Sequence, residues 1–341
     1  MTSVYVYMLK EKKFEKQKLK PNEYVNGIIS GNRVILSRAI TLIESKLQAD
    51  NELAESLIEQ LLPRTGKSLR IGITGVPGSG KSTFIESFGK LLTSLGKKVA
   101  VLTIDPTSQI SKGSILGDKT RMEELANDPD AFIRPSPSGN TLGGVHSRTR
   151  ETMLLCEACG FDIIIIETVG VGQSEVAIRG IVDFFLLITL SGAGDELQGI
   201  KRGIMEMADA IVVNKADGEN IKKAQRTKQD YINALHMFPP TASGWIPQVL
   251  TSSALFKEGL EEVWEMIEKY ESQTKKVGYF LRNRQNQNLQ WMNDIIDFQL
   301  KYDFYHSASI KQKMGELENQ VREENMPAST AAKILLKKFK E

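Results

Sequence analysis

The side chains best suited to chemistry stand in one glycine-rich run. Residues 75–82 read Gly-Val-Pro-Gly-Ser-Gly-Lys-Ser and match the pattern G-x-x-x-x-G-K-[ST] at every fixed position. The glycines can adopt positive φ, so successive backbone N–H groups can converge on an anion. We expect Lys81 to bring a charge to the β- and γ-phosphates of a nucleoside triphosphate, and Ser82 to offer a hydroxyl to Mg²⁺. The predicted phosphate-binding residues are Gly75, Val76, Pro77, Gly78, Ser79, Gly80, Lys81, Ser82 and Thr83.

The segments on either side of this run are typical of a strand and a helix. Residues 69–74 are a short apolar stretch that predicts a buried strand. Apolar residues then recur at helical spacing through residues 81–95, and Gly96 stands where a helix-terminating glycine belongs. These residues are Phe84, Ile85, Phe88, Leu91, Leu92 and Leu95. The loop is therefore expected at a helix N-terminus, where the helix dipole favours an anion.

A second polar cluster is typical of guanine recognition. Asn214-Lys215-Ala216-Asp217 follows the apolar stretch 210–213 and matches N-K-x-D. The Asp217 carboxylate can accept hydrogen bonds from N1–H and the 2-amino group of guanine, whereas adenine has neither donor. Two charge-assisted bonds of about 1.5–3 kcal/mol each would favour GTP over ATP by at least about a hundredfold. Lys215 is expected to lie along the base, and Asn214 to tie loops together.

A short polar segment follows the next predicted strand. Ser252, Ser253 and Ala254 resemble the second guanine-side loop of GTPases. That loop acts mostly through backbone N–H groups, so we expect these three residues to contact the base through their main chain.

Carboxylates at the ends of other predicted strands indicate a Mg²⁺ site. Glu167 ends a run of four isoleucines, where an acid must be hydrated, paired or bound to a metal. We expect it in the Mg²⁺ shell, directly or through water, and the alternative is a carboxylate that caps the following turn. Asp105 ends another predicted strand and is expected on the Mg²⁺ side, with Asp118 as a further candidate ligand. Gly170 is placed for its N–H to reach the γ-phosphate.

Residues 113–121 are polar and punctuated by glycine, which is typical of a loop that orders over the γ-phosphate and becomes mobile after hydrolysis. Within this segment, Arg121 either stabilises negative charge in the transition state or forms a surface ion pair. The residues expected to take part in hydrolysis are Lys81, Asp105, Glu167 and Arg121.

Seven short apolar stretches alternate with helical patterns and predict a mostly parallel α/β sheet. Most of them are apolar on both faces, as strands covered by helices on both sides must be. They lie at residues 70–74, 99–104, 131–133, 162–166, 184–190, 210–213 and 248–250. Ligands of such sheets bind at the carboxyl ends of the strands, which is where the polar clusters stand.

Helical patterns flank the sheet at both ends of the chain. One helix face is predicted by Leu36, Ile40, Ile43 and Leu47, and a second helix continues to residue 62. After residue 259 the chain is helical, with late segments at 309–324 and 329–340, the last opened by Ser329 as a cap. This tail is too polar to form a globular core of its own, so we expect it to pack on the sheet or on another subunit.

Composition excludes some functions. The chain has 341 residues, of which 41% are hydrophobic and 25% charged, as in a globular protein. A net charge of +2 gives no strong field for nucleic acid or a membrane, and neither partner is expected. The two cysteines cannot make a disulfide framework, and the first twenty residues match no targeting pattern, so a cytoplasmic protein is expected. Cys156 and Cys159 have C-x-x-C spacing but apolar neighbours, which favours small buried cysteines over metal ligands.

Together these residues resemble the MeaB family of GTPases, called MMAA in man and ArgK in older naming. The resemblance covers about residues 22–335, and it includes the glutamate at position 167, where most GTPases carry aspartate. The matching segments are Gly75–Thr83, Asp105–Ser108, Ser111–Met122, Phe132–Pro137, Thr141–Gly144, Glu167–Glu175 and Gly192–Lys201.

The resemblance implies a function beyond nucleotide binding. It implies a slow GTPase, with GTP/GDP and Mg²⁺ as cofactors, that is stimulated by an adenosylcobalamin-dependent acyl-CoA mutase such as methylmalonyl-CoA mutase. It implies that nucleotide state gates cobalamin delivery to that mutase and protects it from inactivation. Residues 192–201 look like the family's extra switch, with Asp195 and Lys201 coupling nucleotide to partner.

The resemblance also implies a division of the chain. It implies a homodimer built partly by a C-terminal arm. The expected parts are an N-terminal extension (1–21), an N-terminal helical segment (22–68), a P-loop GTPase domain (69–270) and a C-terminal helical dimerisation arm (271–341).

Two other functions use similar loops. A metal-insertion GTPase of the nickel type would carry a segment rich in His or Cys, and this chain has three histidines. A P-loop kinase would use ATP, and the N-K-x-D cluster argues against an ATP user.

Overall fold

The computed structural model describes residues 19–45, 47–105, 122–137, 142–168, 174–191 and 202–340. At its centre is a seven-stranded sheet in the order β3-β2-β4-β1-β5-β6-β7, and every neighbouring pair of strands is parallel. The strands are β1 (Leu69–Gly75), β2 (Val99–Asp105), β3 (Ala131–Pro137), β4 (Ile163–Thr168), β5 (Phe184–Leu190), β6 (Ala210–Asn214) and β7 (Gln248–Thr251). The predicted α/β sheet and its seven strands are confirmed.

The register of the sheet brings the carboxyl ends of its central strands to one edge. Glu167 of β4 pairs with Ile73 of β1, and Gly75 at the end of β1 pairs with Ile188 of β5. Asn214 ends β6, which lies beside β5. Since all these strands run in the same direction, the loops that follow them emerge at the same edge.

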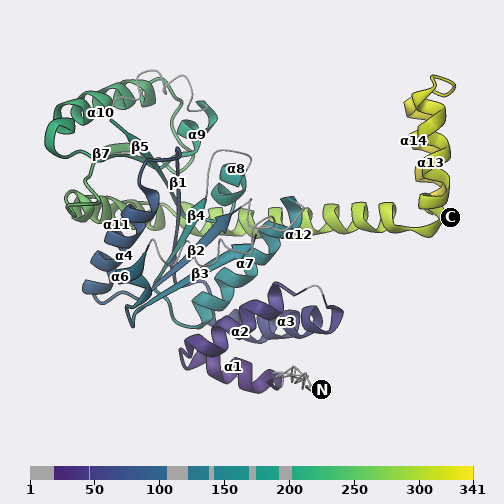
Figure 1. The fold of residues 1–341 in the computed structure, drawn as a ribbon, viewed down its shortest axis with the longest axis horizontal. Helices are drawn as coiled ribbons and strands as arrows, with labels where there is room; N and C mark the ends of the chain where they lie inside the picture. Colours follow the sequence, from purple (N-terminus) through teal and green to yellow (C-terminus); the bar gives the residue numbers. More distant parts are fainter. Residues whose placement is uncertain are drawn as a thin grey trace, which may run out of the picture.

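Apolar layers cover both faces of the sheet, because strand side chains alternate between the faces. The helices of the central region are α4 (Lys81–Ser94), α6 (Glu123–Ala126), α7 (Leu142–Ala158), α8 (Ser174–Arg179), α9 (Arg202–Met207), α10 (Ile221–Leu235) and α11 (Leu260–Lys276). Ile71 and Ile73 of β1 share a core with α4, α6 and α11. Ala100 and Leu102 of β2 share the opposite core with α7, α8 and the N-terminal helices (Figure 1). A third cluster joins α9 and α10 to β5 and β6.

The N-terminal helices are α1 (Pro21–Ile29), α2 (Arg33–Ile43) and α3 (Gln48–Leu61), followed by a 3₁₀ turn, η1 (Leu62–Arg64). The Asn32 side chain caps α2, since its Oδ1 accepts hydrogen bonds from the backbone N–H groups of Val34 and Ile35. The prediction that Leu47 continues the apolar face of this helix is wrong: α2 ends at Ile43, and Leu47 is 64% exposed. The prediction that the apolar face of the helix over residues 81–95 includes Leu95 is also wrong, because α4 ends at Ser94 and Leu95 is 53% exposed.

The C-terminal region consists of α12 (Tyr279–His306), α13 (Ala308–Arg322) and α14 (Ala328–Lys340). Figure 1 shows α12 leaving the body of the protein and carrying α13 and α14 at its far end. The last two helices bury a small cluster of their own, made by Ile310, Leu317, Ala331 and Leu335. The tail was expected to form no globular core of its own, and what α13 and α14 bury is this small cluster, because pairing two amphipathic helices is enough to bury their apolar stripes. Ser329 lies inside α14 and is not its cap.

Both cysteines are buried, as predicted. Cys156 lies in α7 and Cys159 directly follows it, and both thiols are free. Burial raises the pKa of Cys156 well above its usual value and that of Cys159 to about 11, which disfavours the thiolate that a metal site needs. Within the described ranges, no helix combines the length and the apolar character required to span a bilayer.

Candidate nucleotide-binding site

The glycine-rich loop connects β1 to α4 and has the conformation that the sequence predicts. Gly75, Gly78 and Gly80 have φ values of 153°, 81° and 85°. A Cβ atom at position 75 would lie 2.0 Å from the carbonyl oxygen of Ile188, and one at position 80 would lie 2.8 Å from Nδ2 of Asn214. Glycine is therefore required at positions 75 and 80 for two reasons: the backbone has a positive φ, and a Cβ atom would clash with the neighbouring atom.

Lys81 begins α4 and folds back over the loop. Its Nζ donates hydrogen bonds to the carbonyl oxygens of Gly75 at 2.8 Å and Val76 at 3.2 Å. Burial lowers the pKa of Lys81, and the nearby carboxylates of Glu167 and Glu175 act in the opposite direction. An anion in the loop would add negative charge next to this ammonium group and favour its charged form.

An oxygen-donor pair stands beside the loop. Ser82 Oγ donates a hydrogen bond to Oε1 of Glu167 at 3.3 Å, and Glu167 is buried at the end of β4. The hydroxyls of Thr74 and Thr168 lie 2.9 Å apart and join the ends of β1 and β4 next to this pair. Both predicted members of the pair are therefore adjacent in space, although 85 residues separate them in the chain.

Asn214 connects the phosphate loop to the predicted guanine-side loops. Its Nδ2 donates to the carbonyl oxygen of Ser79 at 2.8 Å. Its Oδ1 accepts from Ser252 Oγ at 3.2 Å and from the backbone N–H of Ala254 at 3.1 Å. Only 1% of Asn214 is exposed, so these bonds are made away from water. The structure matches the prediction that this side chain ties loops together.

The Asp217 carboxylate is oriented by the side chain of Ser253, for which the sequence pattern predicted only a backbone contact. Ser253 Oγ donates to Oδ2 of Asp217 at 2.6 Å, whereas the pattern predicted that Ser253 acts through its backbone. The 3₁₀ turn η2 (Gly218–Asn220) follows Asp217, and Lys215 adopts a left-handed φ of 58°. The sequence contained one signal for this contact. A carboxylate that faces a base needs a donor to orient it, and the hydroxyl of Ser253 follows the neighbouring strand, β7.

Glu175 is a further residue of the site, and the sequence pattern predicted no chemistry for it. It lies in the first turn of α8, is 1% exposed, and its charge acts on Lys81. A buried acid next to a phosphate-loop lysine has no signal in the local pattern, because the two residues are brought together only by the packing of α8 on the sheet.

Several predicted residues lie outside the described ranges. They are Asp118, Arg121, Gly170, Asp195 and Lys201. The backbone of Asp105 ends β2, next to β4 and on the same edge as Glu167, and its side chain is not among those described.

A parallel sheet with a phosphate loop between its central strand and the following helix defines a P-loop nucleotide-binding fold. A solved structure of a LAO/AO transport system kinase has this fold with a TM-score of 0.78 and 34% sequence identity, over 95% of this chain and 100% of that one. The model of the family described as methylmalonyl Co-A mutase-associated GTPase MeaB matches residues 36–308. This chain therefore belongs to the MeaB family of GTPases.

Relatives from distant organisms support the same family. A putative GTPase of Caulobacter vibrioides is 50% identical over 313 residues, covering 92% of this chain and 95% of that protein. The mitochondrial methylmalonic aciduria type A homolog of Mus musculus is 45% identical over 324 residues, covering 92% of this chain and 78% of that protein. The GTPase ArgK of Escherichia coli is 47% identical over 270 residues, covering 79% of this chain and 82% of that protein.

Proposed function

We propose that this protein binds and hydrolyses GTP, and that its nucleotide state gates the delivery of adenosylcobalamin to methylmalonyl-CoA mutase or a related acyl-CoA mutase and protects that enzyme. The observation that carries the nucleotide part is the Asn214 side chain. It is bonded to the phosphate loop at Ser79 and to the guanine-side loop at Ser252 and Ala254, so one ligand can be held at both ends by loops that are already joined.

The proposed ligand contacts follow from this arrangement. The backbone N–H groups of residues 75–83 and the Lys81 ammonium hold the β- and γ-phosphates. Asp217 accepts from the guanine edge, oriented by Ser253, and Lys215 lies along the base. Gly170 contacts the γ-phosphate.

The residues at the loop fit a magnesium ion. Ser82 and Glu167 present a hydroxyl and a carboxylate 3.3 Å apart, and hard oxygen donors are what Mg²⁺ prefers. We propose Ser82 and Glu167 as its nearest protein groups, with Asp105 and Asp118 completing the set. The ion would supply charge neutralisation at the β- and γ-phosphate oxygens.

Hydrolysis transfers the γ-phosphoryl group to water: the oxygen of water bonds to the γ-phosphorus, the bond from that phosphorus to the β–γ bridging oxygen breaks, and GDP and phosphate leave. Little covalent chemistry falls to the protein, so its contribution is positioning and charge stabilisation. Lys81 stays charged beside the developing negative charge, and Arg121 is the proposed second cation.

The partner part of the proposal rests on the family and on an exposed surface. The matching family is described as associated with methylmalonyl Co-A mutase. Asp195 and Lys201 are proposed to couple nucleotide state to that enzyme. On α12, Leu289, Met292, Ile296 and Leu300 follow one another at helical spacing and are about half exposed, which supports a homodimer through this arm. The proposed compartment is the reducing cytoplasm, in keeping with the two free, buried thiols.

The alternatives have weaker support. For a nickel-insertion GTPase, the residues that the structure describes hold no cluster of His, Cys, Asp or Glu suited to a metal, and both cysteines are buried with raised pKa values. The kinase alternative is suggested by the name of the solved LAO/AO transport system kinase. Against it, the Asp217 carboxylate that Ser253 orients favours guanine over adenine in this chain.

Two experiments test the proposal in order. Calorimetric titration of the purified protein with GTP, GDP and ATP should show binding of both guanine nucleotides at least about a hundredfold tighter than ATP. Equal affinity for ATP would refute the guanine site. Addition of purified methylmalonyl-CoA mutase should then accelerate phosphate release from GTP; a mutase that neither binds the protein nor changes the rate would refute the partner.

A further inference from the structure

The central strands β1 and β4 separate at the edge of the sheet where the nucleotide is proposed to bind. In the described chain, their backbone pairing ends where Ile73 faces Glu167. Beyond that point each strand follows its other neighbour: Thr74 is paired with β5, and Thr168 is paired with β2. We call Thr74 and Thr168 the strand fork. The phosphate loop continues one branch of the fork, and Glu167 stands at the base of the other.

A hydroxyl pair joins the two branches of the fork. Thr168 Oγ1 donates a hydrogen bond to Thr74 Oγ1 at 2.9 Å, and the two residues are 0% and 1% exposed. Because strand side chains alternate between the faces of a sheet, both hydroxyls lie on the face opposite Glu167. The threonine side chains therefore lie away from any ligand of the phosphate loop. The pair takes the place of the backbone pairing that ends one residue earlier, and it links the strand ends from behind the site.

The bond on the ligand-facing side is a weaker link between the same parts of the chain. Glu167 accepts from Ser82 Oγ at 3.3 Å, whereas O–H···O bonds are usually about 2.7–2.8 Å long. A metal ion held by both groups would also remove this bond, because both oxygens would then be directed at the ion. The threonine bond is shorter and lies out of reach of the ion. It can therefore fix the width of the fork whether or not the site is filled.

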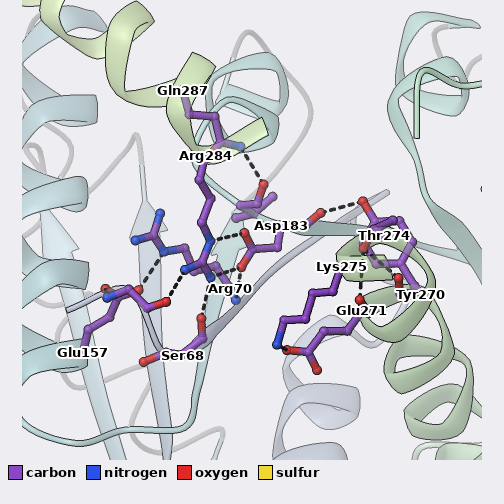
Figure 2. A network of polar contacts seen from close by, with 12 residues as sticks. Ser68, Arg70, Glu157, Asp183, Tyr270, Glu271, Thr274, Lys275, Arg284 and Gln287 are labelled. Carbon is purple, nitrogen blue, oxygen red and sulfur yellow. Dashed lines mark hydrogen bonds and ion pairs between the residues drawn. The ribbon is translucent and has the colours of Figure 1, made fainter. Parts of the chain in front are cut away.

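The opposite ends of the strands are fixed by a buried polar network (Figure 2). The backbone N–H of Arg70, near the start of β1, donates to Oδ2 of Asp183 at 2.8 Å. The Arg70 side chain donates from Nε to Glu157 of α7 at 2.8 Å. Arg284 of α12 donates to both carboxylate oxygens of Asp183, at 2.7 and 2.6 Å. Because these bonds prevent β1 from sliding along its neighbours, the separation of β1 and β4 at the far edge is decided at the fork.

We propose that Thr74 and Thr168 are positioning residues for the magnesium ion, because their bond sets the distance between Ser82 and Glu167. This inference rests on the proposed function, since it requires the ion and the nucleotide. Mg²⁺ demands near-ideal octahedral geometry at about 2.0–2.1 Å, so its affinity depends strongly on the spacing of its oxygen donors. A methyl group in place of either hydroxyl does not fit at the 2.9 Å seen here, since non-bonded carbon contacts are optimal at about 3.5–4.0 Å, and it would widen the fork.

The test measures the contribution of the ion to nucleotide binding in the full-length protein. Calorimetry gives the dissociation constant of a non-hydrolysable GTP analogue in EDTA and in saturating Mg²⁺, for the wild type, Thr168→Val and Thr74→Val. The ratio of the EDTA constant to the Mg²⁺ constant should fall by at least about fivefold in both variants, since groups behind metal ligands typically change metal affinity by about 10–100-fold and this pair acts one step further away. The constant in EDTA should stay within about twofold, because Lys81 and the phosphate loop are unchanged.

Two control variants separate positioning from a general loss of structure. Thr168→Ser keeps the hydroxyl and should keep the wild-type ratio, although its smaller side chain lowers the melting temperature. Thr189→Val removes a different buried hydroxyl pair of the same sheet, because Thr189 of β5 bonds Tyr231 at 3.1 Å. This variant should also unfold at a lower temperature, but its ratio should stay within about twofold of the wild type.

Each possible result decides the proposal. A folded Thr168→Val with the wild-type ratio, or with equal losses in EDTA and in Mg²⁺, would overturn the positioning role alone. If Thr168→Val does not fold, Thr74→Val breaks the same bond from the other strand and is judged by the same ratio. A wild type that binds the analogue equally well with and without Mg²⁺ would remove the magnesium site. A wild type that binds no guanine nucleotide would remove the proposed function as well.

Discussion

Replacing Asn214 with alanine should damage the protein more than alanine at any other neutral side chain of the nucleotide site. The variant loses three hydrogen bonds at once and leaves the Ser79 carbonyl, the Ser252 hydroxyl and the Ala254 N–H without this partner. Each buried group left unsatisfied costs about 1–3 kcal/mol, so the free energy of unfolding should fall by about 3 kcal/mol or more. Because the two nucleotide loops are then no longer joined, affinity for GTP should also fall by at least about tenfold.

Urea unfolding of the nucleotide-free protein measures the stability change, and calorimetry with GTP measures the affinity. Asn233→Ala is the matched control, because Asn233 is exposed on α10 and should stay within about 0.5 kcal/mol of the wild type. Asn214→Asp separates the two loops: it keeps the acceptor for Ser252 and Ala254 but cannot donate to Ser79. Because the buried carboxylate would then face the Ser79 carbonyl oxygen, its loss should be at least as large as that of Asn214→Ala, about 3 kcal/mol or more. If Asn214→Ala unfolds like the wild type and binds GTP normally, the joined-loop reasoning is refuted.

Four further outcomes are expected. Asp217→Asn should weaken GTP and strengthen xanthosine triphosphate, because an amide can donate to the 2-oxo group; competition binding with both nucleotides checks this, and an unchanged preference would contradict it. Lys81→Ala should abolish phosphate release from GTP, and retained turnover would mean that another loop holds the phosphates. Arg284→Met should lower the free energy of unfolding by about 3–5 kcal/mol, since it leaves a buried carboxylate without its cation, while exposed Arg282→Met should have little effect in the same urea titration. Burial alone would raise the pKa of Asp128, but hydrogen bonds, led by the one from Lys90, hold that pKa below the ordinary 3.8. The contribution of the Asp128 carboxylate to the free energy of unfolding should therefore be lost as pH falls below about 4. The difference in free energy of unfolding between the wild type and Asp128→Asn should shrink from about pH 6 to about pH 3.

Much of the fold was predictable because its signals are local. Most strands of the sheet are short stretches that are apolar on both faces, and such stretches predict buried parallel strands without knowledge of the partner strands. The phosphate loop could be predicted from the spacing of its glycines, and the structure shows positive φ angles at Gly75, Gly78 and Gly80. The family likewise followed from contiguous motifs, such as the glutamate that ends the run of isoleucines in β4.

The errors fall at the ends of helices. Leu47 and Leu95 fit an apolar periodicity, yet each stands beyond the last residue of its helix and is exposed. Ser329 has the composition of a cap but lies inside α14. Where a helix stops depends on what the neighbouring chain covers, and periodicity alone does not contain that information.

The amino-acid sequence by itself determined the class of sheet, the phosphate loop, the guanine-side motif and the family, because each depends on residues adjacent in the chain. Only the tertiary structure decided that Ser253 orients Asp217, that Glu175 lies near Lys81, and that Arg284 reaches Asp183 across 101 residues. Such pairs carry no periodic signal. They exist because the parallel strands gather their loops at one edge and because α12 crosses the body at residues 180–183, between α8 and β5. Distant parts of the chain therefore become neighbours only after folding.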